Sequence, residues 1–235
     1  MDPDQKAIAE EFDRYNANYS DTVNASLVLP GMNVDYFTRV KAGHLLDLMN
    51  SELGATHNLN VLDVGCGIGN YHGLIKGEIG RLEGCDISQE SIEHARQRHP
   101  EVSYSSYSGD RLPYTDGAFD VVFTICVMHH VPPARWVNFV HEIRRVLRKD
   151  GLALVFEHNP FNPLTNKVVN RCPFDADAVL LKPSVTRELF SEAGFRQVQS
   201  RSVLNIPSAG KFTRWLDRCL GVLPTGAQYF LIART

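Results

Sequence analysis

The stretch Asn60–Asn70 reads N-V-L-D-V-G-C-G-I-G-N, and the fold of the whole chain follows from it. Its first five residues are mostly apolar and β-branched, which predicts a buried strand. Gly65, Gly67 and Gly69 then interrupt the strand, and we expect a helix to begin near Asn70. Glycines at such a turn let the backbone approach a ligand closely, and a helix start offers unpaired N–H groups. The stretch therefore predicts a ligand-binding loop at the carboxyl end of a strand.

Strands and helices are expected to alternate along the rest of the chain. The patterns indicate further strands over 82–86, 102–107, 119–127, 151–158, 195–204 and 228–233, and helices over 6–19, 35–53, 88–98, 132–149, 184–193 and 212–220. This alternation predicts a doubly wound, Rossmann-like α/β fold. We expect a seven-stranded sheet that is mostly parallel, with one antiparallel edge strand and with helices on both faces.

The chain divides into two predicted parts. Residues 1–56 are expected to form an N-terminal helical lid, and residues 57–235 the main domain. A polar stretch over 159–183 interrupts the main domain. Long polar segments beside a cleft are usually functional, so we expect this insert to bind a substrate.

Composition argues against several classes of protein. With 235 residues the chain can bury a sizeable core, and its net charge of −3 gives no basic field for nucleic acid. No apolar run approaches the ~20 residues of a membrane span, and no signal peptide is visible. The five cysteines form no C-x-x-C pair, which fits free thiols in a reducing compartment. We expect a cytoplasmic protein with neither a nucleic-acid partner nor a membrane span, whose oligomeric state the sequence leaves open.

Asp86 ends the second predicted strand, 23 positions after Asp63. An acid about 20 residues beyond a glycine loop is placed to accept hydrogen bonds from the ribose of an adenosine ligand. The alternative is a surface acid at the start of the helix that Ser88 caps.

The loop also distinguishes between two kinds of adenosine cofactor. A dinucleotide site expects G-x-G-x-x-G, whereas this loop has Gly65, Gly67 and Gly69 followed by Asn70. Asp63 in the strand would repel a pyrophosphate but suits an ammonium group. A ligand that joins adenosine to an amino acid without phosphate fits better, and S-adenosylmethionine is such a ligand.

Several motifs over residues 60–158 resemble those of class I S-adenosylmethionine-dependent methyltransferases, in the same order. V-L-D-V-G-C-G-I-G-N over 61–70 is similar to their first motif and L-E-G-C-D-I-S over 82–88 to their second. The segments 108–114, 119–131 and 145–152 resemble their adenine-binding segment, their fourth strand and the helix-to-strand junction that follows. The resemblance implies a methyltransferase that uses S-adenosylmethionine, releases S-adenosylhomocysteine and needs no metal.

The resemblance also implies which residues bind the cofactor. Asp63 would lie near its amino group and Asp86 at its ribose. The other implied positions are Gly65, Gly67 and Gly69 beneath the cofactor, Cys66 as a packing residue, Ile87 against the adenine, Asp110 at the adenine amino group, and Arg111 and Ile125 in the same cleft. Tyr19, in a break between the lid helices, is expected to cover the sulfonium, because aromatic faces attract cations.

Methylation of an oxygen requires that the acceptor lose a proton, and histidine is the usual base near neutral pH. His129, His130 and His158 lie at predicted strand ends that face the cleft. We expect His158 or His129 to be the base and His130 to make structural hydrogen bonds.

Polar side chains of the insert are expected to recognise the acceptor, and these are Asn159, Asn162, Asn166 and Arg171. Helix caps and turns are the alternative role for each asparagine. The leading interpretation is O-methylation of a small polar metabolite such as a sugar, a carboxylate or a phosphonate.

Other functions stay open, because fold does not fix function. The first alternatives are methylation of a peptide or protein, and N-methylation of a small amine. A protein that binds S-adenosylmethionine without catalysis is a further alternative. An RNA methyltransferase is disfavoured because basic and aromatic residues do not cluster.

Overall fold

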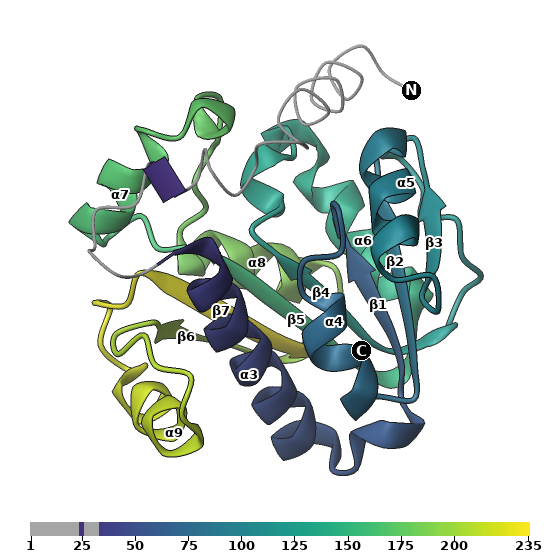
Figure 1. Ribbon diagram of the computed structural model, residues 1–235, viewed down its shortest axis with the longest axis horizontal. Coiled ribbons are helices and arrows are strands. Elements are labelled where there is room, and N and C mark those ends of the chain that lie inside the picture. Colours follow the sequence, from purple (N-terminus) through teal and green to yellow (C-terminus); the bar gives the residue numbers. More distant parts are fainter. Residues whose placement is uncertain (1–23, 26–32) are drawn as a thin grey trace.

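A mixed sheet forms the centre of the computed structural model, which describes residues 24–25 and 33–235 (Figure 1). Within that part of the chain the sheet has seven strands in the order β3-β2-β1-β4-β5-β7-β6. The strands are β1 (Asn60–Val64), β2 (Arg81–Asp86), β3 (Ser103–Ser106), β4 (Phe119–Ile125), β5 (Leu147–His158), β6 (Arg196–Val203) and β7 (Gln228–Arg234). Neighbouring strands from β3 to β5 are parallel, whereas β7 is antiparallel to both β5 and β6.

The predicted fold class is confirmed, and the structure adds the position of the antiparallel strand. β7 lies between β5 and β6, so it has a neighbour on each side, and β6 forms the edge. Burial follows this arrangement, because five of the seven residues of β7 are buried while β6 is exposed or half-buried over its first six. An apolar run suits a strand with two neighbours, and alternating polar residues suit an edge.

Helices cover both faces of the sheet, as predicted (Figure 1). Buried residues of α3 (Val34–Leu53), α4 (His72–Ile75) and α5 (Gln89–Arg98) pack on one face, and those of α6 (Trp136–Val146) and α8 (Pro183–Glu192) on the other. Successive residues of β4 alternate between the two cores, since Phe123 contributes to the first and Val122 to the second. The remaining described helices are α7 (Pro163–Val169) and α9 (Lys211–Leu220).

Polar side chains at three helix starts explain where these helices begin. The Ser88 side chain accepts a hydrogen bond from Ser91 N at 2.9 Å and caps α5, as the sequence predicts. Asn33 caps α3 by accepting from Tyr36 N at 2.8 Å. Asn162 caps α7 by accepting from Leu164 N and Thr165 N.

The boundary between α6 and β5 differs from the prediction. We expected a helix over 132–149, but α6 ends at Val146, and Arg148 and Lys149 belong to β5. Leu147 is buried and pairs with Phe119, so the chain enters the sheet four residues earlier than Gly151. The predicted irregular insert likewise contains α7 and a short 3-10 helix over Pro173–Asp175.

α3, which we assigned to the lid, packs on the sheet through Val40, Leu45 and Met49. Residues 1–23 and 26–32 lie outside the described residues, so the rest of the lid stays a prediction, Tyr19 included. No described helix combines the length and the apolar character that crossing a membrane requires.

Asp217 connects three elements, and its replacement tests their contribution to stability. Its carboxylate is fully buried, accepts from Leu204 N and Ile206 N at 2.8 Å each, and lies 3.3 Å from His44 Nε2 of α3. Asp217→Asn turns an N–H group toward one of these amides, so we expect the free energy of unfolding to fall by roughly 1–3 kcal/mol. Denaturant unfolding measures this change.

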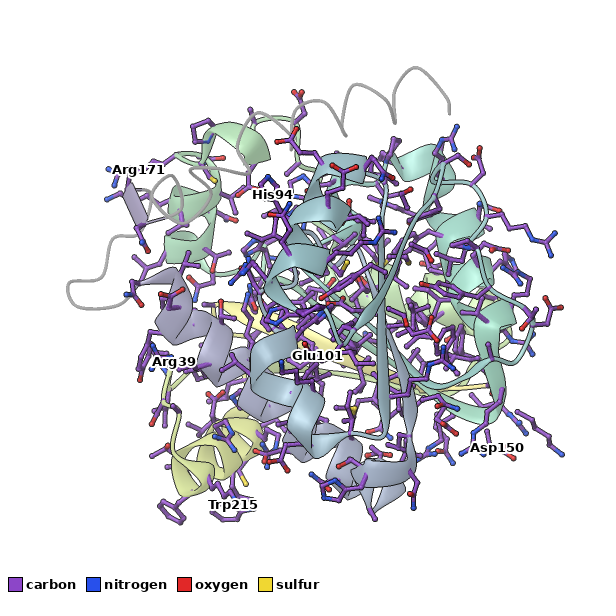
Figure 2. All side chains as sticks on the ribbon, turned by 45° about the vertical axis from the view of Figure 1, so that its right-hand side comes forward. Arg39, His94, Glu101, Asp150, Arg171 and Trp215 are labelled. Atoms are coloured by element: carbon purple, nitrogen blue, oxygen red, sulfur yellow. The ribbon has the colours of Figure 1, made fainter. Side chains whose placement is uncertain are left out.

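The control is Asp150→Asn, at an exposed carboxylate labelled in Figure 2, which should change stability by less than about 0.5 kcal/mol. Burial raises the pKa of Asp217, but the His44 side chain and the two N–H groups outweigh it and lower this pKa. The deficit of Asp217→Asn should therefore be full above the usual pKa of about 3.9 and shrink as the pH falls below it. Equal stabilities for Asp217→Asn and Asp150→Asn would contradict this role.

Candidate active site

A cavity of about 550 Å³ lies at the carboxyl ends of the parallel strands. Its volume is within the range of about 300–1,000 Å³ that is typical of small-molecule and cofactor sites. The lining comes from the first turns of α3, the loop after β1, the end of β2, the turn after β4, the end of β5, α7 and the start of β7. Parallel sheets of this topology bind ligands at this edge.

The three glycines of the loop after β1 all have positive φ angles, of 77°, 51° and 72°, but they serve different purposes. A Cβ on Gly65 would lie 2.5 Å from the Val127 side chain, and one on Gly69 would lie 2.9 Å from the Tyr104 hydroxyl. Both positions are therefore packed by protein. A Cβ on Gly67 would meet no atom within 4 Å, and Gly67 lines the cavity. The backbone at Gly67 is thus left open toward the space where a ligand would bind.

Asp86 holds this loop and faces the cavity. Its two carboxylate oxygens accept hydrogen bonds from Gly67 N at 2.8 Å and from Ser88 N at 2.9 Å. Burial raises the pKa of Asp86, and these two N–H groups oppose the rise. The carboxylate is therefore fixed at the end of β2, with Ile87 beside it in the lining.

Asp63 does not line the cavity, in contrast to the expectation. It is buried beneath the loop, with Oδ2 3.0 Å from His72 Nε2, and His72 Nδ1 lies 2.6 Å from the Tyr104 hydroxyl. Burial raises the pKa of Asp63, whereas the His72 hydrogen bond lowers it. The pair supports the loop from below, a role that β1 dictates because Asp63 points to the face that α4 covers.

The segment after β3 also differs from the expectation. Asp110 and Arg111 are exposed and do not line the cavity, and Asp110 forms an ion pair with Arg135. Tyr107 and Gly109 of the same segment line the cavity instead.

Two other expected cofactor positions, Ile125 and Cys66, do line the cavity. Burial raises the pKa of Cys66 well above its ordinary value, which agrees with a packing role rather than a nucleophile.

Glu157 organises the turn after β4. Its Oε1 accepts hydrogen bonds from Val127 N at 3.1 Å and Met128 N at 2.7 Å, and its Oε2 lies 2.5 Å from His129 Nδ1. All of this is buried, since His129 and Glu157 are 2% and 1% exposed. Burial lowers the pKa of His129, but the carboxylates of Glu157 and Asp175 outweigh it and raise the pKa to about 10. His129 is therefore a buried cation with fixed partners.

His130 faces the cavity beside it. Its ring centroid lies 4.1 Å from that of His129, and its Nε2 lies 3.4 Å from Asp175 Oδ1. Burial and the neighbouring His129 cation lower the pKa of His130 to about 3, so its imidazole is neutral. We expected His130 to be the structural member of the pair, but the structure gives the more deeply buried, carboxylate-bound position to His129.

His158 ends β5 and lines the cavity. Its Nδ1 lies 3.5 Å from Gln228 Nε2, which also lies 3.1 Å from Cys126 Sγ. Burial raises the pKa of Cys126, but Lys41 and His158 outweigh it and bring the pKa to about 7. Lys41, Cys126, His158 and Gln228 thus form a polar wall at the end of the cavity away from Asp86.

Comparison with known proteins assigns this arrangement to a family. Residues 61–151 match the sequence model of a family described as a methyltransferase domain. An uncharacterized methyltransferase from Synechocystis is 31% identical over 120 residues, which cover 51% of this chain and 56% of that protein. The chain therefore spans about half the length of this curated relative.

Solved structures show the same fold. A SAM-dependent methyltransferase from Thermotoga maritima, described as a possible histamine N-methyltransferase, matches with a TM-score of 0.66 at 18% identity over 96% of this chain and 98% of that chain. The Haemonchus contortus phosphoethanolamine N-methyltransferase 2, in complex with phosphomonomethylethanolamine and S-adenosylhomocysteine, matches with a TM-score of 0.59 at 16% identity over 81% of this chain and 52% of that chain.

Residues 61–151 of this chain thus match a methyltransferase domain, and the chain has the fold of SAM-dependent methyltransferases.

The polar insert over 159–183 contributes less to the cavity than the sequence suggests. Asn159 and Asn166 do not line it, because their side-chain amides donate to backbone carbonyls of Pro224, Gly226 and Pro160. Arg171 is exposed at the outer edge of the molecule, where Figure 2 labels it. Asn162 does line the cavity while it caps α7.

Sequence reasoning missed Lys41, Asp175 and Gln228, which line the cavity, and Glu157, which lies behind the lining and binds His129. A signal existed for Glu157, because an acid directly after the apolar run Leu152–Phe156 of β5 must be buried and therefore needs partners. Lys41 and Gln228 reach the cavity only through contacts between distant parts of the chain. No local pattern marks them.

The loop glycines give a direct test of the expected cofactor site. Gly67→Ala places a methyl group in the cavity, so it should weaken S-adenosylhomocysteine binding at least tenfold, while the positive φ costs only about 1–2 kcal/mol of stability. Gly65→Ala should unfold the protein more easily, because its methyl group collides with Val127. Calorimetric titration and thermal unfolding measure the two effects.

The matched control is Gly77→Ala, where the added Cβ meets nothing within 4 Å and lies away from the cavity lining. It should bind S-adenosylhomocysteine like the unchanged protein. Equal affinity in Gly67→Ala and Gly77→Ala would show that the ligand does not approach Gly67.

Proposed function

We propose that this protein transfers a methyl group from S-adenosylmethionine to a hydroxyl oxygen of a small polar acceptor. One observation carries the proposal: a single cavity reaches from Gly67 and Asp86 to His158 and Gln228. A cofactor bound at the first end and an acceptor bound at the second would therefore meet inside the same cavity. Holding two reactants in line can supply much of the rate of such a displacement.

The first end of the cavity fits an adenosine ligand without phosphate. Asp86 presents a fixed, buried carboxylate, and its oxygens keep room for donors beyond Gly67 N and Ser88 N. Ile87 and Tyr107 add apolar surface beside it. When bound, S-adenosylmethionine supplies a methyl group activated by its sulfonium charge.

The second end is shaped for a polar group that donates a hydrogen bond. Gln228 is 5% exposed and lines the cavity, and its Oε1 has no hydrogen-bond partner among the described residues. A buried oxygen without a hydrogen-bond donor costs about 1–3 kcal/mol. A hydroxyl or an amine of the methyl acceptor would therefore gain affinity by donating a hydrogen bond to Gln228 Oε1. The donor would then lie next to His158.

His158 is the base that we propose for an oxygen acceptor. His129 is held as a cation by Glu157 and Asp175 and cannot take a further proton, and the pKa of His130 is lowered to about 3, which makes it a weak base. His158 lines the cavity beside the unpartnered oxygen of Gln228. We therefore no longer propose His129 as the base, and we assign it a positioning role.

Amine N-methylation is the second candidate. The Thermotoga maritima structure is described as a possible histamine N-methyltransferase, and the Haemonchus contortus structure holds phosphomonomethylethanolamine. An amine would also satisfy Gln228 Oε1. In both candidate reactions we propose that the methyl acceptor is a small molecule, because the cavity volume suits one cofactor and a small acceptor better than a peptide chain.

We further propose a cytoplasmic location and no nucleic-acid partner. The scattered cysteines and the net charge of −3 support these two proposals.

Binding experiments test the cofactor first. Calorimetric titration should show S-adenosylmethionine and S-adenosylhomocysteine binding, and far weaker binding of NAD. Tight binding of NAD with no heat from S-adenosylmethionine would overturn the proposal. Ligand binding without turnover of any hydroxyl or amine acceptor would instead favour the non-catalytic alternative.

Asp86→Asn should weaken S-adenosylhomocysteine binding by about 10- to 150-fold, because hydrogen bonds to a charged group contribute about 1.5–3 kcal/mol. Calorimetric titration measures the change. Glu101→Gln is the control, since Glu101 (labelled in Figure 2) is an exposed carboxylate that pairs with Lys76. If Asp86→Asn and Glu101→Gln bind equally well, the ribose lies elsewhere.

His158→Gln should lower kcat by roughly 10²–10⁴-fold, which is the usual contribution of a general base. Cofactor affinity should stay unchanged, because His158 lies at the other end of the cavity from Asp86. Steady-state kinetics with the acceptor, found by screening hydroxyl and amine metabolites, measures kcat. Normal turnover in this variant would mean that the acceptor is already ionised or is not an oxygen.

A further inference from the structure

We propose that His129, His130 and Asp175 bind one divalent transition-metal ion at the His158 end of the cavity. This site departs from our expectation, because the resemblance implies a methyltransferase that needs no metal. The three side chains come from two separate segments, the turn after β4 and the 3-10 helix Pro173–Asp175, and all three line the cavity. Only the folded chain brings them together.

The donor atoms have the spacing that a metal site needs. His130 Nε2 and His129 Nε2 lie 3.4 Å and 3.8 Å from Asp175 Oδ1. Ligand atoms of the three residues all lie within 4.8 Å of one another. Donors about 2.0–2.2 Å from a tetrahedral ion lie roughly 3.3–3.6 Å from each other, so small adjustments would close the site.

Glu157 gives His129 the orientation of a metal ligand. Its Oε2 takes the Nδ1 side of the ring at 2.5 Å, which directs Nε2 toward Asp175 and His130. A histidine that binds metal through one nitrogen generally donates its other N–H to a carboxylate or carbonyl in this way. The backbone amides of Val127 and Met128 in turn hold Glu157.

The charges of the cluster favour a cation. Glu157 and Asp175 are two acids that are 1% and 8% exposed, and they face two imidazoles. A divalent ion with neutral imidazoles would balance both carboxylates at once. A proton on His129 balances only one of them, and this proton is what the ion would replace.

Two imidazoles and one carboxylate suit zinc or ferrous iron, and a three-residue set leaves a coordination position open. This position would face the cavity and thus the acceptor. The role of the ion in the reaction rests on the proposed function, whereas its binding does not. If the proposed function holds, the ion would make an acceptor hydroxyl bound to it more acidic, and His158 would take the proton of that hydroxyl. The oxygen–methyl bond then forms as the sulfur–methyl bond of the cofactor breaks, and S-adenosylhomocysteine leaves.

The test is metal binding to the full chain without a histidine tag, after treatment with a chelator. Calorimetric titration with Zn²⁺ and the visible absorption of Co²⁺ should both show one equivalent bound. Asp175→Asn and His130→Gln should each weaken binding at least tenfold. Glu157→Gln should weaken it by about 10- to 100-fold, as loss of a supporting carboxylate does at other sites.

His94→Ala is the matched control, since His94 (labelled in Figure 2) pairs with Glu90 at 3.8 Å on the exposed side of α5. It should bind the metal as well as the unchanged protein. S-adenosylhomocysteine affinity, measured on every variant, shows which of them are folded. Asp175, His130 and Glu157 lie outside the end of the cavity that Gly67 and Asp86 line. The S-adenosylhomocysteine affinity of their variants should therefore not change.

Four outcomes decide the proposal. Loss of Co²⁺ binding in the cluster variants alone supports it. Absence of stoichiometric binding in the unchanged protein overturns it and leaves a hydrogen-bonded ion cluster. Equal loss in His94→Ala overturns it as well. Metal binding that depends on the cluster without any S-adenosylhomocysteine binding would support the metal site and contradict the proposed function.

Discussion

The end of the cavity near His158 depends on one buried carboxylate, that of Glu157. It binds the backbone N–H groups of Val127 and Met128 and the imidazole of His129. These three bonds join the end of β5 to the turn after β4, which Cys126 enters with a positive φ of 58°. A buried charge is stable only when its oxygens are satisfied, so the turn and the carboxylate require one another.

A second imidazole–carboxylate pair, His72 and Asp63, lies beneath the glycine loop. This pair stays below the lining, and the loop backbone above it is bound by Asp86, whereas His129 binds Glu157 and reaches the lining itself. The difference follows from the strand faces, because Asp63 points into the core beneath α4 and Glu157 points toward the turn.

Local patterns predicted the elements well and the site only in part. β1 has the predicted bounds, Ser88 caps α5, and Asp86 faces the cavity, because each depends on residues close in sequence. Asp110, Asn159 and Arg171 were placed by analogy or by residue type, and the structure puts their side chains outside the lining. Glu157 and His129 are separated by 28 positions, and only the pairing of β4 with β5 brings them together.

The position of β7 has a consequence for how the chain folds during synthesis. β7 follows the other described strands in the sequence, yet it lies between β5 and β6. Until it leaves the ribosome, one side of β5 has no strand to pair with, and an unpaired apolar strand is a template for aggregation. The residues over 60–125, with the glycine loop and Asp86, can meanwhile assemble. The nascent protein would therefore form the part of the cavity around Gly67 and Asp86 before Gln228 completes the other end, and a ligand bound there would stabilise the incomplete sheet.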